Sequence, residues 1–449
     1  MQTSSDSSVR TSPAPRPVRA PATSARPVSV SRDWVRRAVV AAQRIPPVDG
    51  ADAGLRDSGF ATDAADVLRD IGLIQLDPLM RVSTAQRLTC LTRLPRTHRA
   101  DDVDGSLWPQ GRVAAFESFT KVACVFPIED WPLLRLRRER QAAGHRREMP
   151  VAMVEQIRQV VSEAGRGVQI GAIESQVGDG ERTTGWNWTQ VKVVAELMVR
   201  TGELVITARD GTTRLFDLPQ RALPAQVREA AELPDDELRA ALARRAAANL
   251  AVMTRADFAH HYHLTAEDAA AGIALAGLVP LEVEEVEGWD ARHEAYCLPE
   301  LLDGELPDPT AQGVLPGPAA HAAHTAVDVG DGVGGARQQW GVPREARLIG
   351  PFDPLLRDRG RARRVFGFDY LFEAYVPRAK RVYGHYVMGV LSGGRMIGRV
   401  DIQRVGAELR INGAFPESGV PRRVLLPRVR GAGKTLARQL VAELVMPDS

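Results

Sequence analysis

The spacing of apolar residues predicts two helices near the start of the chain. Apolar residues recur at helical spacing in SRDWVRRAVVAAQRI, residues 31–45, and the proline pair at 46–47 ends this helix. A second helix is predicted for 62–71, with Gly72 as its end. The stretch that follows, LIQLDPLMRV, is apolar but too short for another helix, so we expect it to be extended.

Residues 149–224 carry the pattern of a winged helix. We predict one helix over MVEQIRQVVSEAG, a short one near 173, and a third that opens at Asn187 or Trp188. Two strand-like stretches, ELVITAR and TTRLFDL, then flank Asp210-Gly211, a strong hairpin signal. Three helices followed by a hairpin predict a winged helix-turn-helix.

The same order recurs in residues 235–300. A long helix is predicted over ELRAALARRAAANLAV, and the strand LVPLEVEEV follows later. Between them, Thr254 precedes Asp257 and Thr265 precedes Asp268 by three residues, the spacing of a capping box. We therefore predict a second winged helix.

The rest of the chain divides by composition and pattern. Residues 1–30 are rich in Ser, Pro, Ala and Arg and predict a disordered basic arm, and residues 31–148 form an N-terminal helical or winged-helix unit. Residues 303–345, rich in Gly, Pro, Ala and His, predict a surface linker. The C-terminal part, 346–449, shows strand-like alternation in YLFEAYVP and in YGHYVMGVLSGGRMIGRVDIQ, and the final helix is predicted over KTLARQLVAELV. The fold class is thus α+β: tandem winged-helix units followed by a mixed α/β C-terminal part.

Composition excludes several classes of protein. The 449 residues are 44% hydrophobic and 25% charged, which excludes a wholly disordered or fibrous chain. No run of 18 apolar residues predicts a membrane span. The three cysteines are far apart with no CxxC pair, which argues against a zinc ribbon and a disulfide scaffold, and we expect a reducing cytoplasm. Because the formal net charge is only +2, a nucleic-acid surface must be a local patch.

Gln75 and Asp77 are the first candidates for chemistry. In an extended segment they point to the same face, while Ile74 and Leu76 point into a core. A carboxylate beside an amide suits water activation, because the acid accepts a proton and the amide orients the water. Spacing alone favours a plain turn, since Asp-Pro is a common turn starter and Gln75 could simply be exposed.

A basic and aromatic stretch in the C-terminal part is the second candidate. Arginines interleaved with aromatic residues fit a phosphate and base surface; those concerned are Arg357, Arg359, Arg361, Arg363, Arg364, Lys380, Arg381, Tyr383, His385 and Tyr386. The alternative is a solvated helix face, which Asp353 and Asp358 neutralise in part.

The start of the third helix in 149–224 is a candidate for DNA contact. Trp186, Trp188 and Lys192 lie there, and helix N-termini and lysine suit phosphate groups. The alternative is that Trp188 packs within its own unit.

Two further motifs favour no chemistry. His260, His261 and His263 lack further ligands at a recognisable spacing, so we expect no metal site. The sequence GAGKT at 431–435 lacks the first glycine of a phosphate loop and more simply caps the last helix.

Four ordered stretches resemble the bacterial winged-helix DNA glycosylases of the AlkZ and YcaQ type. They are IGLIQLDPL, FPIEDWPLLRLRRER at 126–140, GWNWTQVKVVAELMVRTGELVI with RLFDLPQRALP at 185–224, and IGPFDPLLRDRGRARRVFGFDYLFEAYVPRAKRVYGHYVMGVLSGGRMIGRVD at 349–401. The Gln-x-Asp form is typical of the YcaQ-like branch. The chain departs from the pattern where Lys121 stands in a stretch that carries a histidine in relatives, where Arg357 takes a tryptophan position, and in its longer linker.

The resemblance implies a C-shaped molecule around a basic DNA channel and a monofunctional DNA glycosylase. Its implied substrate is a 7-alkylguanine in duplex DNA, and some relatives unhook interstrand crosslinks. Gln75 and Asp77 would be catalytic, and the candidate DNA contacts are Arg81, Lys121, Trp188, Lys192, Arg357, Arg359, Lys380, Arg381 and Tyr383. We expect no metal, no cofactor, no lyase activity, a monomer, and a place in the bacterial cytoplasm at the nucleoid. The alternatives are a winged-helix transcription regulator without catalysis and a protein-interaction scaffold.

Overall fold

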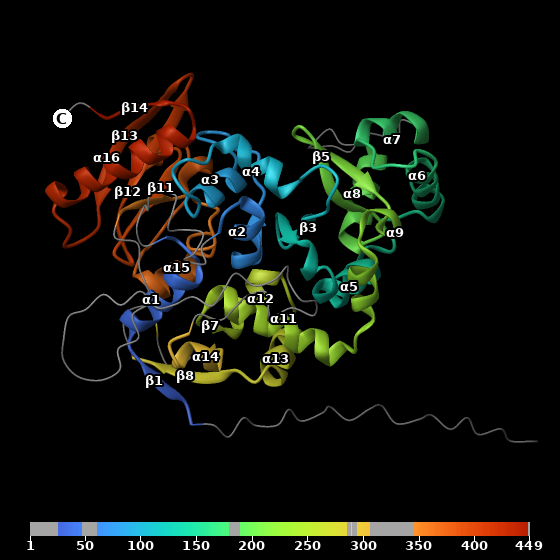
Figure 1. The fold of residues 1–449 in the computed structure, drawn as a ribbon, viewed down its shortest axis with the longest axis horizontal. Coiled ribbons are helices and arrows are strands. Elements are labelled where there is room, and N and C mark those ends of the chain that lie inside the picture. The colour runs from blue at the N-terminus through green and yellow to red at the C-terminus, as the bar shows by residue number, and fades with distance from the viewer. Residues whose placement is uncertain are drawn as a thin grey trace, which may run out of the picture.

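Three β-sheets carry the fold, and each takes strands from distant parts of the chain. The computed structural model describes residues 26–46, 61–178, 189–284, 289, 294–305 and 345–447. Within them, the C-terminal sheet lies at one end of the molecule and helices α6–α8 at the other, with α2 and β3 between them (Figure 1). This mixture of helices and sheets confirms the α+β class.

The first sheet joins the N-terminal unit to the predicted winged helix at 149–224. Its strand order is β2 (Ile74–Gln75), β4 (Ala123–Pro127), β3 (Ala115–Phe119), β5 (Val205–Asp210) and β6 (Thr213–Asp217). Glu117 of β3 is paired with Ile206 of β5, so one sheet crosses the predicted domain boundary at 148. The boundaries themselves stay a prediction.

The first two N-terminal helices form where the sequence predicts them, and two helices that were not predicted follow. These are α1 (Arg32–Ala42), α2 (Ala64–Ile71), α3 (Ala85–Leu91) and α4 (Ala100–Leu107). Ser31 caps α1 by accepting the N–H of Trp34 at 3.1 Å, and Asp63 caps α2 in the same way. Gly72 ends α2 with a φ of 79°, as predicted. A Cβ at Gly72 would lie 2.2 Å from Oδ1 of Asn249, so this glycine also permits a close approach.

The elements predicted for 149–224 are present. After η1 (Ile128–Asp130), η2 (Pro132–Leu134) and α5 (Arg135–His145), helices α6 (Val151–Glu163), α7 (Ile170–Val177) and α8 (Gln190–Thr201) pack together beneath the β5–β6 hairpin. Thr189 is the N-cap of α8, and Asn187 and Trp188 lie outside the described residues. A winged-helix assignment for this unit stays a prediction.

The helix-rich order also recurs in 235–300. After α9 (Pro219–Ala222), α10 (Ala225–Glu229) and η3 (Ala230–Glu232) come α11 (Asp235–Leu250), α12 (Arg255–Tyr262), α13 (Ala266–Leu275) and α14 (Pro299–Leu302). Thr254 and Asp257 form the predicted capping box, each accepting the other's N–H at 3.0 Å.

The second sheet corrects the predicted N-terminal arm. Its order is β1 (Val28–Val30), β8 (Val279–Val283), β9 (Ala295–Cys297) and β7 (Met253–Thr254). Val28 and Val30 fall within the arm predicted to be disordered, yet they pair in parallel with Leu281 and Val283. The free edge of β8 supplies the partner that the composition of the arm could not reveal. Residues 1–25, and 306–344 of the predicted linker, lie outside the described residues.

The third sheet holds the C-terminal part and corrects two predictions. Its order is β10 (Arg347–Ile349), β11 (Val387–Ser392), β12 (Arg395–Val405), β13 (Glu408–Pro416) and β14 (Glu443–Val445), with the predicted turn at Gly393-Gly394. The stretch YLFEAYVP is not a strand. It contains η4 (Glu373–Tyr375) and precedes η5 (Arg378–Lys380), because the buried Glu373 carboxylate binds three backbone N–H groups and folds the chain back.

The last helix, α16 (Arg422–Gln439), begins twelve residues earlier than predicted and ends earlier too. Residues 431–435 therefore lie inside the helix and do not cap it. Leu425, Val429 and Leu436 keep one helical face buried across this stretch, and the chain then returns to pair β14 with β13.

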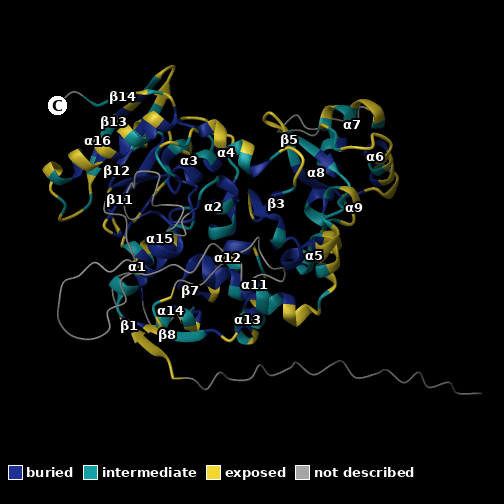
Figure 2. Cartoon of the chain, viewed as in Figure 1, coloured by how far each residue is buried: buried dark blue, intermediate teal, exposed yellow. Residues whose placement is uncertain are grey.

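One hydrophobic core connects the N-terminal helices to the third sheet. It includes Leu68, Ile74 and Leu88 together with Val390 and Ile402. Figure 2 shows β11 and β3 as largely buried strands. Helix α15 (Arg359–Phe366) packs against α1 in a second core. Among the described helices, none is long and apolar enough to cross a membrane.

Candidate active site

The segment that carries Gln75 and Asp77 bridges two sheets. On one side, Gln75 pairs with Cys124 of β4, and the N–H of Leu76 donates to the carbonyl of Ala123 at 2.8 Å. On the other side, the carbonyl of Arg81 accepts the N–H of Arg404, on β12, at 2.9 Å. Asp77 therefore lies between the first and third sheets.

The two candidate side chains contact each other. The Gln75 side chain lies close enough to the Asp77 carboxyl to lower its pKa. Ile74 is fully buried and Leu76 packs against the same core, as the alternation predicted. Gln75 is more enclosed than a projecting side chain, at 8% exposed, while Asp77 is partly exposed. The opening to solvent is thus at Asp77, with Gln75 behind it.

Asp77 also makes the turn that the plain interpretation of Asp-Pro predicts. Its Oδ1 accepts the N–H of Leu79 at 3.0 Å. Burial raises the pKa of the Asp77 carboxyl above its ordinary value, although the Leu79 N–H and the Gln75 amide act in the opposite direction. The turn holds the Asp77 carboxylate in place. Because this carboxylate is partly desolvated, it is a stronger base than an exposed aspartate.

Tyr386 is a neighbour of Asp77 that the sequence placed on a surface. It is fully buried in the core that also contains Ile74, and its Oη has no hydrogen-bond partner among the described residues. Burial, Tyr370 and the Asp77 carboxylate all raise the pKa of Tyr386, so the hydroxyl stays protonated. The expectation that Tyr386 belongs to an exposed basic surface is wrong.

Lys121 and Arg357 meet at one hairpin tip. Lys121 is exposed in the turn between β3 and β4, next to Thr120. Nη2 of Arg357 donates to Oγ1 of Thr120 at 3.3 Å, and Arg137 donates to the Thr120 carbonyl at 3.2 Å. Because β4 pairs with β2, this tip lies beside the Gln75 segment. The two residues that depart from the family pattern are therefore close together in space.

The other C-terminal candidates differ in how exposed their side chains are and in how many contacts they make within the protein. Lys380 is exposed on η5, whereas Arg381 donates to the carbonyls of Val376 and Ala374 at 2.8 and 3.3 Å. Arg359 donates to the Pro351 carbonyl at 2.9 Å and lies over Tyr370, and burial lowers the pKa of its guanidinium. The Tyr383 ring packs between Arg399 and Phe415.

Arg361 fits neither alternative proposed for the basic run. It is buried and donates to the carbonyls of Leu250 and Val252, both at 2.7 Å, and to the Asp257 carboxylate at 3.1 Å. It therefore connects α15 to α11 and α12, and it is neither a phosphate contact nor part of a solvated face.

The remaining candidates lie on different elements. Arg81 is exposed, and its guanidinium contacts the Gln403 side chain. Lys192 is in the first turn of α8, and Figure 1 places that helix far from the C-terminal sheet. Trp188 lies outside the described residues. The structure brings Arg81, Lys121 and Arg357 toward the Gln75 segment, but not Lys192.

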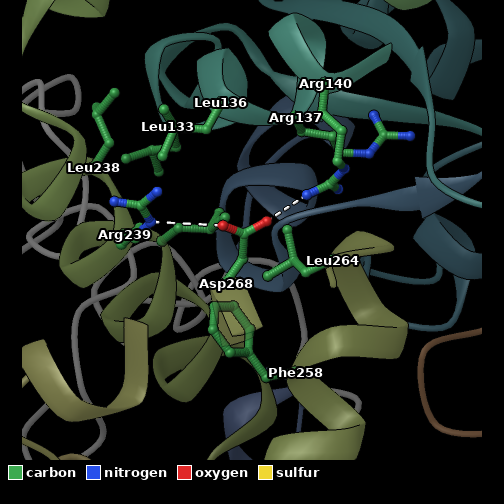
Figure 3. Close-up of a pocket in the computed structure, with 10 residues that line it drawn as sticks. Leu133, Leu136, Arg137, Arg140, Leu238, Arg239, Phe258, Leu264 and Asp268 are labelled. Atoms are coloured by element: carbon green, nitrogen blue, oxygen red, sulfur yellow. Dashed lines mark hydrogen bonds and ion pairs between the residues drawn. The ribbon is translucent and has the colours of Figure 1, made fainter. Parts of the chain in front are cut away.

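A separate pocket lies between α5, α11, α12 and α13 (Figure 3). Leucines and Phe258 line it, and Asp268 pairs there with both Arg140 and Arg239. No lining residue comes from the segment 73–81. In the described part of the chain, no three His, Cys, Asp or Glu side chains gather to hold a metal ion.

Comparison with known proteins finds a similar solved structure and a matching family. The solved structure of the DNA glycosylase AlkZ from Streptomyces sahachiroi matches with a TM-score of 0.55 at 14% identity, over 92% of this chain and 99% of that one. At this identity the likeness shows the fold. The family model described as "DNA glycosylase AlkZ-like" matches residues 68–317 and 322–439, which include Gln75 and Asp77. Since that match spans most of the sequence, the chain belongs to the AlkZ-like family of DNA glycosylases, DNA-binding enzymes of DNA repair.

Proposed function

We propose that this glycosylase hydrolyses the N-glycosidic bond of 7-alkylguanine in duplex DNA, with Asp77 and Gln75 as its catalytic residues. The observation that carries the proposal is that the Gln75 and Asp77 side chains lie together, with Gln75 enclosed and Asp77 partly exposed to solvent. Membership of a DNA glycosylase family supports the reaction type.

The chemistry of an alkylated purine matches what these two side chains supply. Alkylation at N7 leaves the base cationic, so it departs without a strong acid. The sugar then passes through an oxocarbenium-like state, as in glycoside hydrolysis. Asp77 stabilises that cation and takes a proton from the attacking water, and Gln75 orients the water. General-base catalysis contributes about a hundred- to ten-thousand-fold, which suits a bond that is already labile.

The products follow from the nucleophile. Water attacks C1′, the C1′–N9 bond breaks, and free alkylated base and an abasic site remain. No lysine takes part in this scheme, so we propose that the DNA strand is not cut. The reaction needs neither metal nor organic cofactor, and one chain suffices as a monomer.

Interstrand crosslinks are the finer part of the proposal. A flipped base costs a few kcal/mol of unstacking, but a crosslinked base cannot leave the duplex without its partner strand. An enzyme that unhooks such a lesion must bind it on an open basic surface. The partial exposure of Asp77 and the cations Arg81, Lys121 and Arg357 support this arrangement.

The direct test is base release from duplex DNA with one 7-methylguanine, beside the same duplex with a nitrogen-mustard crosslink. The protein should release free 7-methylguanine, and Asp77→Asn should abolish release while it keeps DNA affinity. Undiminished release by Asp77→Asn would refute the assigned role. Sodium borohydride added during turnover should trap no protein–DNA adduct, since a trapped adduct would indicate an amine nucleophile.

A further inference from the structure

The loop 370–386 presents large apolar side chains to solvent. Leu371 is 59% exposed, Val382 is 71% exposed, and Tyr375, at 83%, is the most exposed aromatic residue in the described part of the chain. Single exposed apolar residues are common on protein surfaces, but three in one loop make it a candidate binding surface.

This loop is firmly anchored. The Glu373 carboxylate accepts the N–H groups of Val382, Tyr383 and Gly384 at 2.8, 2.8 and 3.0 Å. Burial would raise the pKa of Glu373, but these three donors hold it below its ordinary value, so the carboxylate remains charged. Arg381 closes the other side by donating to the Val376 carbonyl at 2.8 Å. Tyr375 is thus exposed on a fixed backbone.

Two aromatic rings, Phe372 and Tyr386, connect Tyr375 with the surroundings of Asp77. Phe372 makes an edge contact with Tyr375 at 6.2 Å between ring centroids, and another with Tyr386 at 5.8 Å. Tyr386 belongs to the core against which Leu79 packs, two residues after Asp77, and it interacts electrostatically with the Asp77 carboxylate. The exposed ring therefore lies at the outer end of a packed row that leads to the candidate active site.

The charge around Tyr375 is complementary to DNA. Arg378 and Lys380 are exposed immediately after it, on η5, and the acid of this loop, Glu373, is buried. Apolar side chains of minor-groove proteins enter base steps, and aromatic rings stack on bases, while neighbouring cations bind phosphates. The two exposed cations that follow Tyr375 favour a phosphate-bearing partner, DNA, over a protein partner.

We propose that Tyr375 contacts the substrate DNA, with its ring stacked on a base next to the lesion and with Arg378 and Lys380 on the flanking phosphates. This inference rests on the proposed role of Asp77, because proximity to Asp77 is what places Tyr375 beside the damaged nucleotide. A base displaced toward Asp77 leaves a gap in the stack, and an aromatic ring held at a fixed position fills it.

The test compares Tyr375→Ala with Tyr375→Phe. On duplex DNA with one 7-methylguanine, Tyr375→Ala should lower kcat/KM by roughly ten- to a hundredfold, because one base–aromatic stacking contact is lost. Tyr375→Phe keeps the ring and should stay within about twofold, as should the remote exposed control Val151→Ala. All three variants should unfold at the wild-type temperature.

A second readout separates this proposal from the catalytic one. 2-Aminopurine next to the lesion should change in fluorescence when Asp77→Asn binds, although that variant releases no base, and the double variant Asp77→Asn with Tyr375→Ala should lose the change. If Tyr375→Ala keeps both wild-type kcat/KM and the fluorescence change, the stacking role is wrong. If wild-type protein releases no 7-methylguanine, the substrate proposal fails, yet the fluorescence comparison still decides the role of Tyr375.

Discussion

The Arg93 guanidinium and the Asp353 carboxylate form a bidentate ion pair that is completely buried, with N–O distances of 2.7 and 3.1 Å. Arg93 also donates to the carbonyl and the side-chain oxygen of Gln43, each at 2.9 Å. These contacts connect the end of α3 with the C-terminus of α1 and with the segment after β10. Residues 260 positions apart in the chain thus hold the N-terminal and C-terminal parts together.

Asp353→Ala should destabilise the protein strongly. It leaves the Arg93 charge buried without its carboxylate, and breaking such a pair costs about 3–5 kcal/mol. The free energy of unfolding, measured by denaturant titration, checks this. The surface pair of Arg158 and Glu155 serves as control, since Glu155→Ala removes an exposed ion pair that contributes at most about 1 kcal/mol. Equal losses in the two variants would contradict the structural role of the buried pair.

Asp77→Asn should stabilise the protein at neutral pH while it abolishes base release. Because the folded-state pKa of Asp77 is raised, the ionised carboxylate costs stability above that pKa, and the cost disappears as pH falls below the ordinary value near 3.8. Thermal unfolding should therefore show a higher Tm for the variant at pH 7 and a shrinking difference toward pH 4. Asparagine keeps an oxygen that accepts the Leu79 N–H, so the turn survives.

The rate of base release by the wild-type protein should depend on pH through the ionisation of Asp77. The rate should be level at neutral pH and fall as pH decreases through the raised pKa of Asp77, because protonation removes the general base. A rate that stays constant down to pH 4 would show that the Asp77 carboxylate is not the base.

Substitution of Arg361 should lower stability, whereas substitution of Lys380 should weaken DNA binding, although the sequence places both in one basic stretch. Arg361→Met removes one buried donor from Asp257 and from two backbone carbonyls, so we expect a loss of about 3–5 kcal/mol in stability and no change in the salt dependence of DNA binding. Lys380→Ala should leave Tm unchanged and reduce the slope of log K against log salt concentration by about one. An unchanged slope would exclude Lys380 as a phosphate contact.

Short-range sequence signals predicted the elements that depend on neighbouring residues, namely helix ends, hairpin turns and strand faces. Apolar spacing and the proline pair at 46–47 defined α1, Gly72 defined the end of α2, and turn glycines defined the hairpins at 210–211 and 393–394. Strand alternation also brought Gln75 and Asp77 to one place, because side chains two apart in an extended segment share a face.

The features that the sequence did not predict depend on contacts between residues far apart in the chain. Val28 becomes a strand residue only because β8 lies beside it, and Gln75 becomes a strand residue because β4 pairs with it. Arg361 resembles a surface arginine until α11 and α12 supply acceptors from more than a hundred residues away. Tyr375 was missed because alternation in YLFEAYVP suggested a strand, whereas the buried carboxylate of Glu373 folds that stretch into a loop.

The three cysteine thiols should be inert in the native protein. Cys90, Cys124 and Cys297 are buried and free, and burial raises the pKa of Cys297 to about 12, so the reactive thiolate is scarce at pH 8. A colourimetric thiol reagent should react with none of them until denaturant is added, and then with three.

Cys124 is the most informative of the three cysteines, because it is the strand partner of Gln75. Its labelling, identified by loss of one thiol in Cys124→Ser, should occur only when β2 separates from β4. Rapid labelling of Cys124 under native conditions would mean that the catalytic segment opens readily, which contradicts a fixed Gln75.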